Sequence, residues 1–138
     1  MIRKILIAYD TSAPADKAFE FALEIAGKFA AELIVLAVAR LPEPPEAVET
    51  EAMLERARQL YDRSFSGLLA KAAAAGVDPR CEVKVGHPAE QIVHLADLEQ
   101  VDMIVMGHRG HSGVKRWLLG SVSKRVMSYA PCTVCIVR

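Results

Sequence analysis

Short apolar runs alternate with longer helix-forming segments along this chain of 138 residues, and no other feature constrains its fold as strongly. The helix-forming segments carry apolar residues at a spacing of about 3.6 residues, whereas the short runs have strand length. Strands that alternate with helices imply right-handed crossovers and a parallel sheet covered on both faces. The sequence therefore predicts one α/β domain over residues 1–138, with a doubly wound, open, five-stranded parallel sheet.

The expected elements follow from these runs. The expected strands are residues 2–9, 33–38, 81–85, 101–106 and Thr133–Val137. The expected helices begin at about Pro14, at Ala47, after Gly86-His87-Pro88 and at Val122. Residues 81–85 alternate more than the other strands, which predicts a position near an edge of the sheet.

Charge and composition exclude several classes of protein. Lys+Arg and Asp+Glu both number 17, so the formal net charge is zero. This balance argues against nucleic acid or an anionic membrane as a partner. No run approaches the ~20 apolar residues that span a bilayer, and no targeting segment is visible. Three cysteines do not suggest a disulfide framework, so we expect a cytoplasmic protein.

The stretch after the fourth expected strand carries the strongest functional signal. Gly107, Gly110 and Gly113 lie three apart, and glycine permits positive φ with uncovered main-chain N–H groups. Gly120-Ser121 then opens a helix, whose first N–H groups lack intrahelical acceptors. A strand, a glycine loop and a helix N-terminus together form a phosphate cradle. The alternative is that these glycines only form turns and bind no ligand. Their position between a strand and a helix disfavours this alternative.

The pattern Gly107-x2-Gly110-x9-Gly120-Ser121 resembles the nucleotide-binding motif of the universal stress protein family, in its ATP-binding branch. The opening and closing runs are also similar to that family, and Thr133 replaces a proline that is common there. The resemblance covers essentially the whole chain. It implies the strand order 3-2-1-4-5, in which the chain reverses direction between the first and fourth strands. Ligands of open α/β sheets bind at such a reversal, beyond the carboxyl ends of the strands.

The resemblance also implies a ligand, which is ATP with Mg²⁺ or Mn²⁺ bridging its phosphates. The phosphate contacts that it assigns are Arg109, Gly110, Gly120, Ser121, Val122 and Ser123, with hydroxyl donors from the two serines. It assigns the ribose contact to Gly107, and Met106 completes this part of the nucleotide-binding set. The adenosine pocket that it assigns consists of Ala8, Tyr9, Asp10 and Val38. Neither a catalytic residue nor a metal ligand from the protein is predicted.

Several residues near the motif have two interpretations. Asp10 is equally suited to accept hydrogen bonds from a ligand and to cap the first helix. Lys115 and Arg116 either contact phosphates or are solvated loop charges, and the second reading is favoured. Trp117 is expected to anchor its loop against the sheet rather than to stack on a base.

The cysteines and histidines carry weaker signals. Cys132 and Cys135 have C-x-x-C spacing, but they lie in an expected strand, where residues three apart point to opposite faces. A redox or metal role is therefore not predicted. Solvated or capping roles are expected for the histidines, although protonated His108 or His111 stays open as an aid to phosphate binding. The histidines in question are His87, His94, His108 and His111.

These observations favour a nucleotide-dependent switch or interaction module in a stress response, with an unknown protein partner. A homodimer is expected, because Thr133–Val137 forms an apolar edge strand and family members pair their last strands. A covered edge in a monomer is the alternative. An ATP-using enzyme (a slow ATPase or a nucleotidyl transferase) and a non-binding structural interaction protein also stay open. The sequence has no P-loop, kinase glycine loop or Ser-His-Asp set, which favours at most slow hydrolysis.

Overall fold

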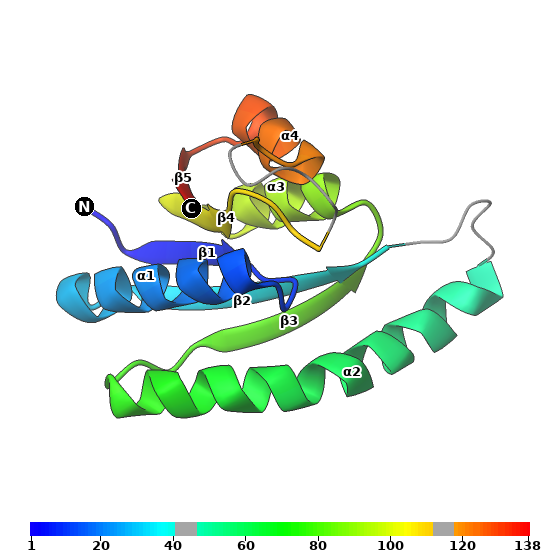
Figure 1. Ribbon diagram of the computed structural model, residues 1–138, viewed down its shortest axis with the longest axis horizontal. Helices are drawn as coiled ribbons and strands as arrows, with labels where there is room; N and C mark the ends of the chain where they lie inside the picture. Colours follow the sequence, from blue (N-terminus) through cyan, green and yellow to red (C-terminus); the bar gives the residue numbers. More distant parts are fainter. Residues whose placement is uncertain (41–46, 112–117) are drawn as a thin grey trace.

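The computed structural model describes residues 1–40, 47–111 and 118–138, and Figure 1 shows the arrangement of its elements. The strands are β1 (Lys4–Ala8), β2 (Glu32–Ala39), β3 (Arg80–Val85), β4 (Met103–Gly107) and β5 (Thr133–Val137). The helices are α1 (Ala13–Phe29), α2 (Ala47–Ala74), α3 (Pro88–Leu98) and α4 (Ser121–Tyr129). Every expected strand and helix therefore forms close to its expected bounds. No helix within the described ranges is both long and apolar enough to cross a bilayer.

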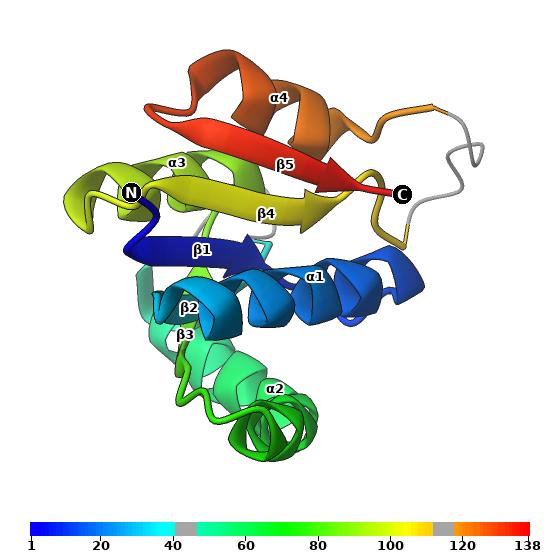
Figure 2. The ribbon, with the colours of Figure 1, turned by 90° about the vertical axis from the view of Figure 1, so that its left-hand side faces the viewer.

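The five strands form one parallel sheet in the order β3-β2-β1-β4-β5, as the resemblance implied. Helices α1 and α2 cover one face of the sheet, and α3 and α4 cover the other (Figure 2). β3 lies at an edge, as its alternating pattern predicted. The chain leaves β1 toward β2 and β3, then crosses back to β4 on the other side. The carboxyl ends of β1 and β4 therefore meet at the reversal point.

The position of β1 at the centre of the sheet explains why its sequence is apolar at every position. Ile5, Leu6 and Ile7 of β1 are completely buried. Ile5 and Ile7 pack in the apolar cluster under α1 and α2, whereas Leu6 packs in the cluster under α3 and α4. A strand that is covered on both faces needs apolar side chains at every position.

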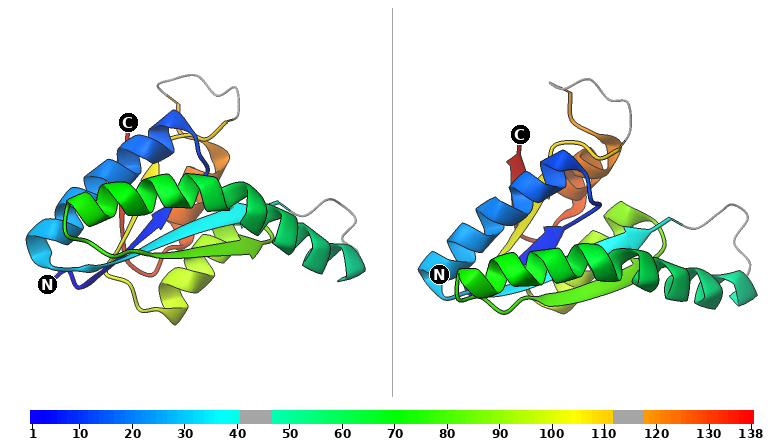
Figure 3. Two further views of the ribbon diagram at one scale, coloured as in Figure 1. Left: turned by 90° about the horizontal axis from the view of Figure 1, so that it is seen from below. Right: turned by 60° about the horizontal axis from the view of Figure 1, so that its bottom comes forward.

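Helix α2 lies along β2 and β3, and its amino-terminal turns extend beyond the sheet (Figure 3). Because it connects two parallel strands, it runs antiparallel to them, and its amino-terminal half lies at their carboxyl edge. The apolar stripe of α2 faces the sheet, and Ala57, Phe65, Leu68 and Ala72 on it are buried. Phe29 of α1 and Tyr129 of α4 are 53% and 71% exposed, because each occupies the last position of its helix.

The cysteines are placed as inert apolar residues. Cys135 packs in the cluster under α1 and α2, whereas Cys132, which directly precedes β5, packs in the cluster on the opposite face. The prediction that these two point to opposite faces is therefore confirmed. Burial raises the pKa of all three thiols, that of Cys81 to about 11. A redox C-x-x-C site needs the opposite shift.

A carboxylate joins β1 to β4 at the amino ends of the two strands. The Oδ2 atom of Asp102 accepts hydrogen bonds from the N–H groups of Arg3 (2.8 Å) and Lys4 (3.0 Å). The N–H of Asp102 in turn donates to the Lys4 carbonyl at 2.9 Å. These hydrogen bonds lower the pKa of the Asp102 carboxyl below its ordinary value of 3.8. The ionised form therefore holds together the strand pair whose opposite ends meet at the reversal point.

We predict that Asp102→Asn is less stable than the natural protein at pH 7. Because the pKa of Asp102 is lowered on folding, its charge stabilises the fold above about pH 4 and stops doing so as the pH falls through the folded pKa. The difference in unfolding free energy should thus be constant from pH 8 to about pH 5 and narrow below pH 4. Urea titrations at several pH values measure it, with Asp97→Asn on the surface of α3 as control. A pH-independent difference would contradict the assignment.

Candidate functional site

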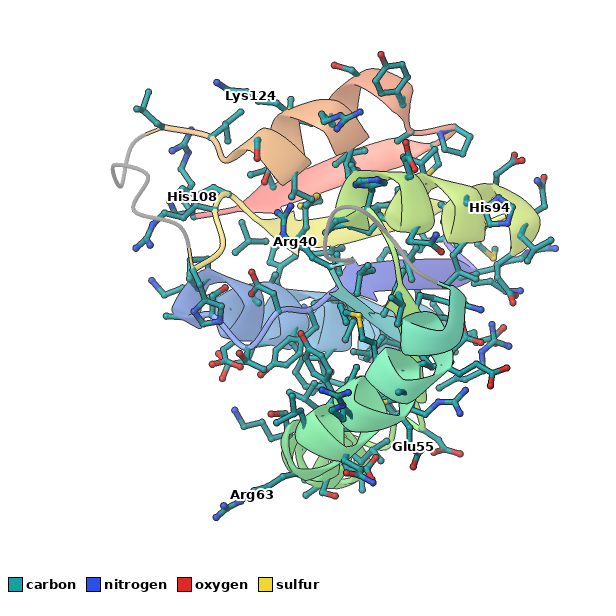
Figure 4. The ribbon with its side chains drawn as sticks, turned by 90° about the vertical axis from the view of Figure 1, so that its right-hand side faces the viewer. Arg40, Glu55, Arg63, His94, His108 and Lys124 are labelled. Carbon is teal, nitrogen blue, oxygen red and sulfur yellow. The ribbon has the colours of Figure 1, made fainter. Side chains whose placement is uncertain are left out.

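A cavity of about 630 Å³ opens at the carboxyl edge of the sheet, a size typical of small-molecule sites. Its walls come from the ends of β1, β2 and β4 and from the first turns of α3 and α4. Every residue that the sequence assigned to nucleotide binding lines it: Ala8, Tyr9, Asp10, Val38, Met106, Gly107, Arg109, Gly110, Gly120, Ser121, Val122 and Ser123. Figure 4 looks onto this edge, and Arg40 is labelled near the middle of the view.

The cavity also has walls that the glycine motif did not indicate. These additional lining residues are Ala15, Leu36, Ala39, Arg40, Tyr61, Pro88, Ile92 and His111. Neither Tyr61, near the middle of α2, nor Arg40, directly after β2, was assigned to the site from the sequence. Their place in the site depends on the strand order, because β2 neighbours β1 there. The position of each residue relative to the carboxyl edge was the signal that could have identified them.

The two ends of the cavity differ in chemistry. At one end α4 begins, and its first N–H groups lack intrahelical acceptors and carry a partial positive charge. Arg109 lies at this end, and its Nε is buried without a hydrogen-bond partner among the described residues. At the other end, apolar side chains of β2 and α3 form the wall, with Leu36, Val38 and Ile92 among them. An elongated ligand with an anionic head and a flat apolar body matches this gradient.

The motif glycines provide space for close approach rather than positive φ. Among the described glycines, positive φ occurs at Gly76 and Gly86, outside the motif. At Gly107, a Cβ would lie 2.7 Å from the Pro14 Cβ and 2.8 Å from the Pro14 carbonyl carbon. The expectation of left-handed backbone is therefore wrong for the described motif glycines, because the end of β4 needs room against the first turn of α1. Gly113 lies outside the described residues.

The other motif glycines are also in close contact with neighbours. A Cβ on Gly110 would overlap the Oδ2 atom of Asp10, and a Cβ on Gly120 would lie 3.3 Å from the Arg109 Cα. The N–H of Gly120 donates to the His108 carbonyl at 2.8 Å. The Gly120 N–H, which was expected to bind a phosphate, is thus already hydrogen-bonded within the protein. The N–H groups that remain available at the start of α4 begin one residue later, at Ser121.

Asp10 does not cap the first helix. Ser12 is the N-cap of α1, and its Oγ accepts a hydrogen bond from the N–H of Ala15 at 3.3 Å. The Oδ1 atom of Asp10 accepts from the N–H (3.0 Å) and from the hydroxyl of Ser12. Its Oδ2 atom lies against Gly110 in the cavity wall. Of the two roles weighed for Asp10, capping is therefore wrong, and an oriented carboxylate oxygen remains beside the cavity.

His111 connects the loops that follow β1 and β4. Its Nε2 lies 2.7 Å from the Asp10 carbonyl oxygen and 3.0 Å from the Thr11 Oγ1. Because the Asp10 carbonyl can only accept a hydrogen bond, the hydrogen-bond network assigns a proton to the Nε2 atom of His111. Thr11 has a φ of 68°, a left-handed conformation that this contact helps to hold. His111 is exposed, as expected, and it is in addition hydrogen-bonded to the β1 loop.

His108 and Ser123 join the end of β4 to α4. His108 is 4% exposed, and its ring nitrogens have no partner among the described residues. It is not among the lining residues of the cavity, so neither a solvated role nor a phosphate-directed role fits it. The Ser123 hydroxyl donates to the carbonyls of Gly107 (3.0 Å) and His108 (3.2 Å). That hydroxyl is thus engaged in the fold, whereas the exposed Ser121 keeps an accessible one.

Three expectations lie outside the described residues, namely those on Lys115, Arg116 and Trp117. Across the ranges that the structure does describe, no three His, Cys, Asp or Glu side chains are grouped to hold a metal ion. Asp10 is the one acidic residue that lines the described cavity.

Comparisons with known proteins agree with this fold. The model of the universal stress protein family matches residues 1–138. Universal stress protein YxiE of Bacillus subtilis is 35% identical, with 100% of both chains covered. The structure of UspA from Lactobacillus plantarum superposes with a TM-score of 0.89 at 25% identity, over 99% of this chain and 98% of that one. A universal stress protein crystallised in complex with cAMP has a TM-score of 0.72 at 26% identity, over 99% and 97% of the two chains.

We predict that Gly107→Ala destabilises the protein by about 1–3 kcal/mol, since its new methyl group would meet the backbone of Pro14. The matched control is Gly67→Ala in α2, where a Cβ meets nothing within 4 Å. That change should stabilise the protein by about 0.5–1 kcal/mol, because alanine favours the helix interior. Urea unfolding measures both changes. A neutral Gly107→Ala would show that the close contact is not needed.

Proposed function

Because the chain belongs to the universal stress protein family, we propose that it is a nucleotide-binding regulatory module of the stress response. It binds ATP, with Mg²⁺ or Mn²⁺ on the phosphates, in the cavity at the carboxyl edge of the sheet. One observation carries the proposal: a single cavity has the start of α4 at one end and an apolar wall at the other. Its Cys residues with neutral thiols fit a reducing, cytoplasmic location.

The phosphates are assigned to the end where α4 begins. The N–H groups of Ser121 and Val122 and the Ser121 hydroxyl supply donors there. The orphaned Nε of Arg109 fits an anion, because a buried guanidinium nitrogen without an acceptor is costly. Gly110 and Gly120 bring the backbone close, since a Cβ at either position would meet a neighbouring residue. Anion sites at helix N-termini are commonly built from such N–H groups, as here together with a hydroxyl, an arginine and close backbone.

The base is assigned to the apolar end, where the main chain of Val38 offers a donor and an acceptor. The Leu36 carbonyl accepts from the N–H of Tyr9 (2.8 Å), so it faces β1. Two residues later, the N–H and carbonyl of Val38 face the same side, where the chain has left β1 at Asp10. An adenine edge carries the complementary pair of groups. The complex of a similar protein with cAMP supports an adenine nucleotide here.

The metal is assigned to the ligand rather than to the protein. Mg²⁺ commonly binds through substrate phosphates and keeps several waters. With Asp10 as the single carboxylate of the described lining, the site offers few protein ligands for the metal. This favours binding and release over rapid turnover, and it supports a switch rather than a dedicated ATP-using enzyme.

Calorimetric titration with ATP in MgCl₂ tests the proposal directly. We expect a saturable signal from ATP, and adenine nucleotide in the mass spectrum of ligand released from freshly purified protein. A flat titration together with an empty spectrum would contradict nucleotide binding and favour a purely structural interaction protein.

We predict that Ser121→Asp lowers ATP affinity at least about tenfold without loss of stability. A carboxylate in the first turn favours the helix, but at Ser121 it repels phosphates by a few kcal/mol over a few ångströms. Ser128→Asp is the control, because it adds the same charge to α4 near the opposite end of the helix. Calorimetry and thermal unfolding of both variants separate the two effects. Equal affinities would place the phosphates elsewhere.

The proposed switch acts through a homodimer that pairs two copies of Thr133–Val137. β5 is the edge strand beyond β4, and α4 leads from the phosphate end of the cavity into it. A shift of α4 on nucleotide binding therefore reaches the dimer interface. The Val137 carbonyl accepts from the N–H of His108 (3.0 Å), so the N–H of the preceding residue, Ile136, points to the outer edge.

Light scattering is expected to give a mass of twice 15.1 kDa for the natural protein. Ile136→Pro removes an outward N–H without removing a hydrogen bond to β4, so it should yield a folded monomer. Ile136→Ala, which shortens the same side chain but keeps the N–H, should remain a dimer. A dimeric Ile136→Pro variant would exclude pairing through β5.

A further inference from the structure

Tyr61 is a cavity residue that comes from outside the glycine motif. It lies near the middle of α2, and it packs against the apolar cluster under α1 and α2. Its ring stacks on that of Phe65, with centroids 5.6 Å apart and 24° between the planes. Tyr61 also lines the cavity, so this stacked ring forms part of the cavity wall.

The Tyr61 hydroxyl differs from the other tyrosine hydroxyls. That of Tyr9 donates to the Asp16 Oδ1 at 2.6 Å, and Tyr129 lies 71% exposed at the end of α4, outside the cavity. The Tyr61 hydroxyl makes no hydrogen bond within the part of the chain that the structure describes. Burial, and next the nearby charge of Asp10, raise the pKa of Tyr61, so the hydroxyl stays protonated at neutral pH.

The Asp10 carboxylate complements this hydroxyl from another wall. Its Oδ1 is held by the N–H and hydroxyl of Ser12, which leaves Oδ2 as the acceptor beside Gly110. Tyr61 and Asp10 line the same cavity as Val38 and the start of α4, and the charge of Asp10 acts on Tyr61. In a nucleotide, the sugar occupies the stretch between base and phosphates. A carboxylate is a common acceptor for ribose hydroxyls, and a phenol both donates to and accepts from such a group.

We propose that Tyr61 is a specificity-determining residue: its hydroxyl binds one hydroxyl of the ribose, with Asp10 on the other, and so selects ribonucleotides over deoxyribonucleotides. The inference rests on the proposed function, because it concerns the sugar of the nucleotide assigned to this cavity. It adds a contact from α2, which the spacing of the glycines does not include.

The test compares three ligands on two variants by calorimetry. Tyr61→Phe keeps the ring and its stacking on Phe65 but removes the hydroxyl, and Tyr129→Phe removes a hydroxyl outside the cavity. The ligands are ATP, 2′-deoxy-ATP and 3′-deoxy-ATP, each with MgCl₂. We expect Tyr61→Phe to bind ATP about 3- to 10-fold more weakly, the range for one neutral hydrogen bond. Its affinity for one of the two deoxy analogues should be unchanged, because that analogue lacks the hydroxyl that Tyr61 binds.

The outcomes separate this inference from the function on which it rests. An equal loss for all three ligands would make Tyr61 a merely structural residue, and no loss for ATP would remove it from the site. Either result would overturn the inference while ATP binding by the natural protein upheld the function. A natural protein that binds none of the three ligands would overturn both. A loss in Tyr129→Phe equal to that in Tyr61→Phe would likewise overturn the role of Tyr61.

Discussion

The close packing of the end of β4 against the first turn of α1 is the constraint on which the site depends. Gly107 makes it achievable, because any Cβ would meet the backbone of Pro14. Past this contact the chain leaves the sheet, and the carbonyls at Gly107 and His108 need donors. The Ser123 hydroxyl and the Gly120 N–H supply them. These hydrogen bonds hold the start of α4, with its N–H groups, beside the end of β4.

The two strands at the reversal point are held at one end and open at the other. At the amino ends, Asp102 binds the N–H groups of Arg3 and Lys4. At the carboxyl ends, the β1 loop and the β4 loop enclose the cavity, with Asp10 oriented by Ser12. The side chains that complete the walls come from β2, α2 and α3. The site is thus a product of strand order rather than of any continuous segment.

The sequence predicted the elements well, because buried parallel strands and amphipathic helices have distinct periodicities, and its resemblance to the family implied the strand order that periodicity cannot supply. It also brought together the residues that line the cavity. It misjudged why those residues are there: the described motif glycines serve packing rather than positive φ, and Ser12 caps α1 in place of Asp10. It missed Tyr61 because a half-buried aromatic on an apolar stripe looks like core. Contacts between distant segments decide such roles, and local patterns do not report them.

The bridge from His111 to the β1 loop bears on how fast a bound molecule exchanges. Its hydrogen bonds to the Asp10 carbonyl and the Thr11 hydroxyl must break before the two loops can separate. Breaking them costs about 1–3 kcal/mol, so separated loops are populated roughly 5- to 150-fold less than tied ones. A ligand that passes between these two loops would enter and leave more slowly by the same factor, so its residence time would lengthen without any change in equilibrium occupancy.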